Sequence, residues 1–183
     1  ILTGIMSTAY VRGMQSSGAG ACLKHYAANN QETARGSTSA NVTERALREI
    51  YLKAFGMVVA DADPLTVMSS YNCLNGEHTS VKRELLTDIL RGEFGFEGFV
   101  MSDGVAIDQL DAVTGDRCAS GALALNAGVD MGLWDTGFQM LEDAVARGLV
   151  EEARIDEAAM RILTVKFRRG LFEKPYLPEN DDH

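Results

Sequence analysis

Short apolar segments alternate with longer amphipathic segments along this chain, and the alternation predicts a sheet covered by helices. Residues 20–26, 65–72, 98–104 and 128–134 are short apolar runs bounded by polar or turn residues. Continuous apolar runs of this length are typical of strands buried on both faces of a parallel sheet. We therefore expect an α/β fold with four consecutive β–α units and parallel strands.

The first predicted helix spans residues 43–60. Thr43 is placed to cap its N-terminus, and Glu44 puts a negative charge in the first turn, where it suits the helix dipole. Apolar residues recur at helical spacing and predict one buried stripe. The stripe consists of Ala46, Leu47, Ile50, Tyr51, Ala54 and Phe55.

The later helices are predicted from the same spacing. Residues 75–80 are expected to form a loop before a helix over 81–94, which ends near Gly92 and Gly95. Leu85, Leu86, Ile89 and Leu90 form the apolar face of that helix. Further helices are predicted over 117–127, 136–148 and 155–169.

Two architectures fit these units, a doubly wound sheet and a (β/α)8 barrel. No G-x-G-x-x-G motif follows a strand, which counts against a dinucleotide-binding oxidoreductase. A complete barrel needs about 250 residues and eight strands. The 183-residue chain therefore predicts half of a TIM-type barrel over 1–172, followed by an acidic, proline-containing tail or linker over 173–183.

Composition excludes several classes of partner. The net charge of −9 and pI near 4.8 argue against nucleic-acid binding. No apolar run approaches the about 20 residues needed to span a membrane. The three cysteines, Cys22, Cys73 and Cys118, are expected to be free thiols in a reducing setting, and a Cys73/His78 metal pair lacks further ligands.

The chain begins at Ile1 rather than Met and has no signal-peptide layout. We therefore expect that sequence upstream of Ile1 has been removed. The missing signal-peptide layout and the odd number of thiols favour a cytoplasmic location.

Three predicted strands end in polar pairs: Lys24-His25, Tyr71-Asn72 and Ser102-Asp103. The carboxyl ends of parallel strands meet at one edge, so these residues predict a polar site for a hydroxylated or anionic ligand. Each pair also has a structural alternative, since an aspartate often caps a turn, a lysine is often solvated and a tyrosine often packs.

Longer motifs resemble glycoside hydrolase family 3, in order and over nearly the whole chain. Two of them carry polar strand ends, namely KHYAANNQE (24–32) and VMSSYNCLNG (67–76). The others are TERALREIYLKAF (43–55), LLTDILRGEFGFEGFVMSDG (85–104), AGVDMGLW (127–134) and RILTVKFRRGLFEKPY (161–176).

The resemblance implies a retaining, exo-acting β-glycoside hydrolase that needs no metal or organic cofactor. Asp103 would be the nucleophile, Lys24 and His25 would bind sugar hydroxyls, and Tyr71 would lie close to Asp103. Met68 and Trp134 are expected to line the pocket. The implied substrates are β-linked glucosides, xylosides or short oligosaccharides.

Two departures limit what the resemblance implies. Many members carry Trp directly after the nucleophile, where this chain has Gly104, so the sugar preference stays open. The acid/base and the first barrel half are expected to lie elsewhere, so we predict that the chain alone is inactive or weakly active. It is expected to pair with its own copy or with a complementary barrel half. The alternative is a non-catalytic, self-associating half-barrel or a weak sugar-binding module.

Overall fold

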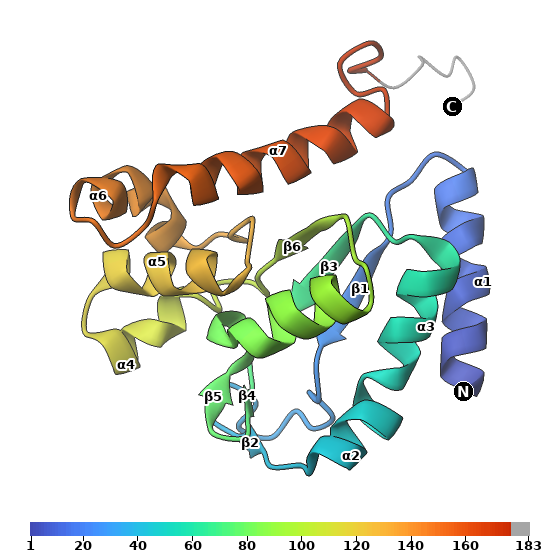
Figure 1. The fold of residues 1–183 in the computed structure, drawn as a ribbon, viewed down its shortest axis with the longest axis horizontal. Helices are drawn as coiled ribbons and strands as arrows, with labels where there is room; N and C mark the ends of the chain where they lie inside the picture. Colours follow the sequence, from blue (N-terminus) through green and yellow to red (C-terminus); the bar gives the residue numbers. More distant parts are fainter. Residues whose placement is uncertain (177–183) are drawn as a thin grey trace, which may run out of the picture.

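A computed structural model describes residues 1–176 as an open parallel sheet surrounded by helices (Figure 1). Its strands are β1 (Cys22–Tyr26), β3 (Thr66–Ser69) and β6 (Phe99–Met101), in the order β1-β3-β6. Both pairings are parallel. The α/β class and the parallel pairing predicted for these three strands are therefore confirmed, while the sheet does not close into a barrel within this part of the chain.

The fourth predicted strand, over 128–134, is wrong as a strand. Only one parallel bridge forms there, between Met101 and Met131. The amides of Asp130 and Met131 both donate to the Val100 carbonyl, at 2.7 and 3.1 Å. The Val100 amide donates to the Asp130 carboxylate at 2.9 Å. Because a side chain accepts this donor, the regular ladder between the two segments is interrupted.

A second, smaller sheet lies beside the polar strand ends. It contains β2 (Ser39–Ala40), β4 (Cys73–Leu74) and β5 (Glu77–His78). The expected loop over 75–80 is thus partly wrong, since β4 and β5 form an antiparallel hairpin. Asn75 and Gly76 make its two-residue turn with φ of +52° and +87°. Asn-Gly is the preferred pair for a turn with two positive φ angles, so the sequence did contain this signal.

The helix predicted over 43–60 extends from Glu44 to Ala62 in three parts: α2 (Glu44–Ala46), a π-helical turn η1 (Leu47–Tyr51) and α3 (Lys53–Ala62). The Thr43 cap is confirmed, because its hydroxyl accepts from the Ala46 amide at 3.2 Å. The predicted stripe is wrong at Ile50, which is 68% exposed, whereas Leu52 is fully buried. The extra residue in a π turn shifts the helical phase, and Leu52 accordingly donates to Leu47 five residues back.

The helix predicted over 81–94 is η3 (Glu84–Glu93), and it covers the centre of the sheet. Its apolar face is confirmed as core, packing in one cluster with Val67 of β3 and Val100 of β6. Gly95, with φ of +74°, ends the helix because few other residues adopt that conformation. The four predicted core residues Leu85, Leu86, Ile89 and Leu90 are each at most 1% exposed.

The remaining helices flank this centre. α1 (Leu2–Ser16), which the sequence analysis did not predict, lies alongside α3 (Figure 1). The helix predicted over 117–127 is α5 (Arg117–Ala127), and 136–148 forms η5 (Thr136–Met140) and α6 (Leu141–Ala146). The last is α7 (Glu152–Arg168), which begins three residues before the predicted start. Two short helices, η4 (Asp108–Leu110) and α4 (Asp111–Thr114), follow β6, and η2 (Thr79–Val81) precedes η3.

A buried ion cluster fastens α7 to the sheet. The Asp130 side chain is fully buried and accepts from Arg91 of η3 at 2.6 Å. It also accepts from Arg154 and Arg161 of α7, at 2.9 and 2.8 Å. One carboxylate thus joins two helices and the Val100 strand, and the three guanidinium groups share its charge.

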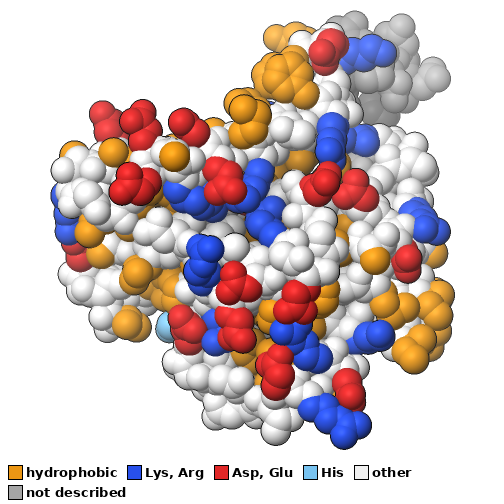
Figure 2. All heavy atoms as spheres, viewed as in Figure 1, with side chains coloured by type: hydrophobic (Ala, Val, Ile, Leu, Met, Phe, Trp, Pro, Cys, Tyr) orange, Lys and Arg blue, Asp and Glu red, His pale blue; other side chains and the backbone are white. Residues whose placement is uncertain are grey.

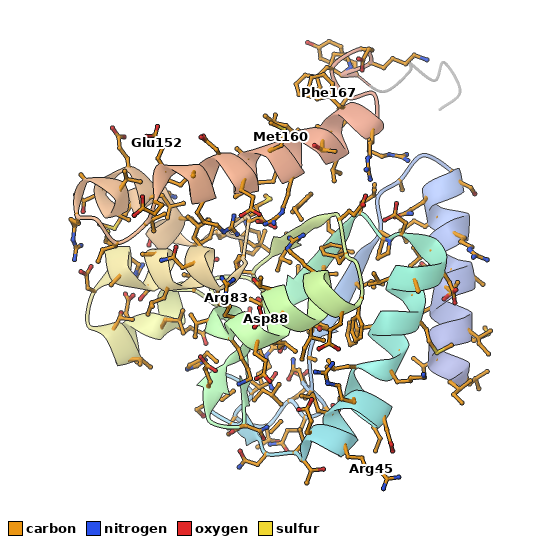
Figure 3. All side chains as sticks on the ribbon, in the orientation of Figure 1. Arg45, Arg83, Asp88, Glu152, Met160 and Phe167 are labelled. Carbon is orange, nitrogen blue, oxygen red and sulfur yellow. The ribbon has the colours of Figure 1, made fainter. Side chains whose placement is uncertain are left out.

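The outer faces of α7 and α1 expose apolar side chains. Met160 and Phe167, labelled in Figure 3, are 65% and 59% exposed on the side of α7 turned away from the sheet. Figure 2 shows hydrophobic atoms gathered there and near the start of α1. The exposed apolar residues here are Ile1, which precedes α1, and Leu2, Ile5, Met6 and Tyr10 of α1.

Within residues 1–176, the helices are too short or too polar for any of them to traverse a bilayer. Of the tail or linker predicted over 173–183, residues 177–183 lie outside the described part.

Candidate active site

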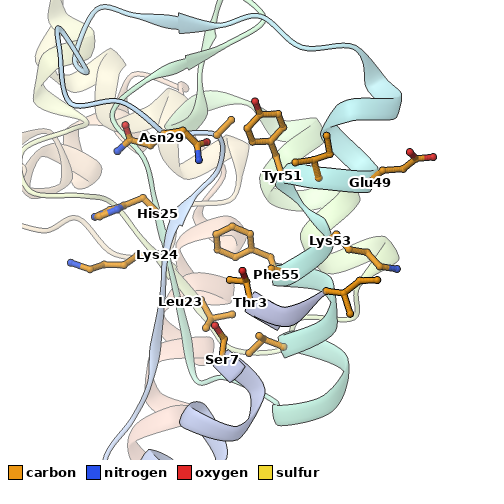
Figure 4. Close-up of a pocket in the computed structure, with 16 residues that line it drawn as sticks. Thr3, Ser7, Leu23, Lys24, His25, Asn29, Glu49, Tyr51, Lys53 and Phe55 are labelled. Atoms are coloured by element: carbon orange, nitrogen blue, oxygen red, sulfur yellow. The ribbon is translucent and has the colours of Figure 1, made fainter. Parts of the chain in front are cut away.

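A bulge in β1 turns two consecutive polar side chains toward the site. Leu23 pairs with Val67 and Tyr26 pairs with Ser69, so β1 contains one more residue than β3 over the same length. A bulge of this kind re-aims side chains that would otherwise point to opposite faces. Figure 4 shows Lys24 and His25 extending in the same direction, away from Phe55. Local strand geometry therefore places the Lys24 and His25 side chains on the same side of β1.

Asp103 lies directly after Ser102 at the carboxyl end of β6. Its side chain is 14% exposed, and its Oδ1 accepts from the Gly104 amide at 2.8 Å. The other oxygen, Oδ2, is buried without a hydrogen-bond partner among residues 1–176. The His25 Nε2 atom lies 3.4 Å from it. One carboxylate oxygen is thus held by the backbone, and the other is left free beside an imidazole ring.

Burial and the charge of Asp103 act on the pKa of His25 in opposite directions. Burial lowers the pKa of His25 below its usual 6.5, and the negative charge of Asp103 opposes that shift. The positive charges of Lys24 and Arg35 lower the pKa further. The ring is therefore neutral at pH 7, with one N–H available to donate to a carboxylate or to a ligand hydroxyl.

Tyr71 holds the turn that follows Asp103. Its hydroxyl donates to the Gly104 carbonyl at 2.6 Å. Burial raises the pKa of Tyr71, and the Asp103 charge raises it further, so the hydroxyl keeps its proton. The Arg35 guanidinium lies over the Tyr71 ring, 4.8 Å from its centroid. Arg35 was not predicted as a residue of the site. It stands three residues after Glu32, the last residue of the KHYAANNQE motif, and pairs with Glu32 at 2.9 Å.

Two buried carboxylates tie the loop after β6 to residues 131–137. Asp135 accepts from the Ser102 hydroxyl at 2.5 Å and from the Ile107 amide at 2.8 Å. Burial raises the pKa of Asp135, although these hydrogen bonds oppose the shift. Asp108, which follows β6, accepts in the opposite direction from the Gly137 amide at 2.9 Å. The loop that carries Asp103 is therefore fixed from both directions, a role that sequence spacing did not reveal.

Asp108 is itself held in the charged form. Burial would raise its pKa, but hydrogen bonds from Gly137 and Thr136, together with the charge of Arg117, lower it overall. The Arg117 guanidinium pairs with Asp108 at 2.7 Å. Asp108 is thus fully engaged in holding the loop.

The structure brings together most of the residues predicted for the site. Asp103, His25 and Tyr71 converge around Gly104, and Trp134 reaches the same place from the next loop. Lys24 is exposed beside His25 and forms no ion pair with any residue in 1–176. Met68 pairs with Met101 in the sheet and is only 8% exposed. Contact of Lys24 and Met68 with a ligand stays a prediction.

A cavity adjoins this cluster without containing its carboxylate. It has a volume of about 560 Å³ and lies between β1, α3 and the start of α1 (Figure 4). Lys24, His25 and Asn29 line it, whereas Asp103 and Tyr71 do not. The convergent polar groups therefore lie at Asp103 and outside this cavity.

The cysteines do not add a metal centre in the described part of the chain. Cys73 and His78 are direct partners across the β4–β5 hairpin. Residues 1–176 contain no group of three or more His, Cys, Asp or Glu side chains arranged to hold a metal ion. The three thiols are free, and burial raises the pKa of each.

Sequence comparison identifies relatives that are four to five times longer. The profile described as "Glycosyl hydrolase family 3 N terminal domain" matches residues 1–165. β-Glucosidase B of Emericella nidulans is 41% identical over 97% of this chain and 20% of its own length. An exo-α-(1→6)-L-arabinopyranosidase of Bifidobacterium longum is 44% identical over 100% of this chain and 23% of its own length.

Structure comparison also finds β-glucosidases. The glucose complex of β-glucosidase 3B from Thermotoga neapolitana has a TM-score of 0.80 and 40% identity, covering 93% of this chain and 24% of that one. A β-glucosidase from Listeria innocua has a TM-score of 0.87 and 28% identity, covering 96% and 26%. The chain therefore spans about a quarter of these enzymes. That it is the second half of their barrel stays a prediction.

Proposed function

Because the chain belongs to glycosyl hydrolase family 3, we propose that it carries the nucleophile-bearing part of a retaining, exo-acting β-glycoside hydrolase of the β-glucosidase type. The observation that carries this proposal is the state of Asp103. Its Oδ1 is held by the Gly104 amide, and its Oδ2 is buried and free beside His25. A carboxylate that is oriented by one oxygen and unoccupied at the other suits attack on an anomeric carbon.

The proposed first step is a displacement at the anomeric carbon. Oδ2 of Asp103 forms a bond to C1 while the bond from C1 to the glycosidic oxygen breaks, and the leaving group takes that electron pair. Water then attacks C1 of the glycosyl ester, which restores the carboxylate and releases the sugar and one proton. The anomeric configuration is inverted twice and therefore retained.

The neighbouring side chains suit sugar binding. Neutral His25 and exposed Lys24 offer N–H donors to ring hydroxyls, and donors that bind more tightly in the transition state accelerate the reaction. Tyr71 holds the backbone at Gly104 and thereby fixes the direction of the Asp103 carboxylate. Met68 would supply apolar surface beneath the sugar.

The acid that protonates a natural leaving group must come from elsewhere. In a retaining enzyme the second carboxyl lies about 5–5.5 Å from the first. Glu32 is 77% exposed and paired with Arg35, and Glu77 is paired with Lys82. Asp108 is fully engaged in holding the loop. We propose that the acid lies outside these 183 residues, so unactivated glycosides are turned over slowly or not at all.

A second candidate function is association through the open edges of the sheet, with little or no catalysis. Within residues 1–176, β1 pairs on one side only, and the apolar faces of α1 and α7 are exposed. An unpaired strand beside apolar helices favours binding of further strands and helices. Either a second copy of the chain or a complementary barrel half would meet this requirement.

Covalent labelling tests the catalytic proposal directly. The purified chain is incubated with 2,4-dinitrophenyl 2-deoxy-2-fluoro-β-D-glucoside, and its intact mass is measured. Dinitrophenolate departs without acid assistance, and the fluorine slows hydrolysis of the ester. We expect one added sugar mass, located on Asp103 by peptide mapping. Xyloside and α-L-arabinopyranoside analogues compare the sugar classes, since one relative is an arabinopyranosidase.

Two variants control this experiment. Asp103→Asn keeps the size of the side chain and should abolish labelling. Asp88→Asn, which alters an exposed carboxylate of η3, should label normally. Absence of an adduct from a chain that is folded by circular dichroism would contradict the proposal and favour the associating, non-catalytic alternative.

A further inference from the structure

Gly104, the residue directly after Asp103, carries no side chain between its backbone and the Trp134 indole. Its φ angle lies outside the left-handed region, so the backbone does not demand glycine there. A Cβ atom added at Gly104 would lie 3.5 Å from the Trp134 indole and 3.5 Å from the Tyr71 hydroxyl. One methyl group would fit at ordinary contact distance, whereas a longer side chain would compete with the indole for the same space.

Trp134 is presented to solvent at this point by an uncommon backbone conformation. It is the only tryptophan of the chain, and 78% of its surface is exposed. Its φ of +62° is uncommon for a bulky residue and characteristic of functional sites.

Neighbouring hydrogen bonds fix this conformation. The Leu133 amide donates to the Ser102 hydroxyl at 2.8 Å, and the Val105 amide donates to the Leu133 carbonyl at 2.9 Å. Asp135, the next residue after Trp134, is buried and accepts from Ser102. An exposed indole is thus anchored on both sides to the loop that carries the nucleophile.

We infer that Trp134 is a specificity-determining residue whose exposed indole stacks on the apolar face of the sugar ring attached to Asp103. This inference rests on the proposed function and adds the surface that recognises the sugar. A pyranose presents axial C–H groups on one face, and an aromatic ring held rigidly beside the anomeric position is complementary to them. The indole covers the ring, while His25 and Lys24 serve its hydroxyls.

The single tryptophan gives a direct readout. The chain is labelled with the dinitrophenyl fluoroglucoside, excess reagent and dinitrophenolate are removed by gel filtration, and the emission of Trp134 is compared with that of unlabelled chain. We expect a blue shift and reduced quenching by iodide, because the bound sugar takes the indole out of water. Asp103→Asn, treated identically, should show no change in emission.

The rate of labelling provides the second measurement. Trp134→Ala should lower the second-order rate by about tenfold, as expected for a lost aromatic contact, and Trp134→Phe should retain most of it. An adduct on Asp103 with unchanged emission and a wild-type rate for Trp134→Ala would overturn the inference and leave the proposed function intact. No adduct on folded chain would overturn the proposed function and this inference with it.

Discussion

Removing the Asp130 carboxylate should destabilise the fold more than any exposed ion pair does. The Asp130 side chain is fully buried and accepts from the Val100 amide and from three arginines. In Asp130→Ala, these arginines keep their charges but lose their common acceptor. Breaking a buried ion pair by removing one partner costs about 3–5 kcal/mol.

The exposure of the arginines sets where in that range the loss should fall. Arg91, Arg154 and Arg161 are 12%, 15% and 20% exposed, so water reaches them partly once the carboxylate is gone. Burial already lowers the pKa of Arg91 to about 10, despite the nearby charge of Asp130. We therefore expect a loss of about 3 kcal/mol, the lower end of the range.

Urea denaturation followed by far-ultraviolet circular dichroism measures this loss. Asp143→Ala is the matched control, since that carboxylate is 57% exposed and lies 3.8 Å from Arg147, so its removal should cost at most about 1 kcal/mol. Asp130→Asn should fall between the two, because it keeps an oxygen acceptor without the charge. A loss below about 1 kcal/mol for Asp130→Ala would refute the reasoning, by showing that the cluster is solvated and α7 docks without it.

Two further predictions follow from burial and titration. Leu52→Ala should lower the free energy of unfolding by about 2–5 kcal/mol, and Ile50→Ala by at most about 0.5 kcal/mol, because only Leu52 is buried. Urea denaturation measures both losses, and equal losses would contradict the shift in helical phase at the π turn. His25 has a folded-state pKa below its usual 6.5, so the unfolded chain binds more protons and stability should fall as pH drops from about 6.5 through the folded pKa. His25→Gln should flatten that decline, and an unchanged decline would assign it to other groups.

The sequence predicted the three sheet strands and the helix η3 correctly, but not the phase of the helix over 43–60 or the end of the sheet at 128–134. The parallel strands and the core face of η3 followed from apolar periodicity, which depends on burial alone. Ile50 was misplaced because a π turn changes the period within one helix, and composition does not signal that turn. The fourth strand failed because the Asp130 carboxylate replaced a ladder partner, a tertiary effect that spacing does not encode.

The candidate site was likewise predicted in part. The strand ends predicted that Asp103, His25 and Tyr71 lie together, because parallel strands bring their carboxyl ends to one edge. Asp135 and Arg35 were missed, since their roles depend on contacts with Ser102 and Tyr71. The helix α1 was also not predicted, because no helical periodicity was assigned to its part of the sequence.

The ties between Ser102, Asp135 and Asp108 have an entropic consequence. A free loop loses roughly 1–2 kcal/mol of backbone entropy per residue when a ligand orders it. Here the segment from Asp103 to Asp108 is ordered by the fold itself, through acceptors that are buried before any sugar arrives. The ordering cost of this segment is therefore met once, when the chain folds, and under the proposed function it would not recur with each sugar that binds.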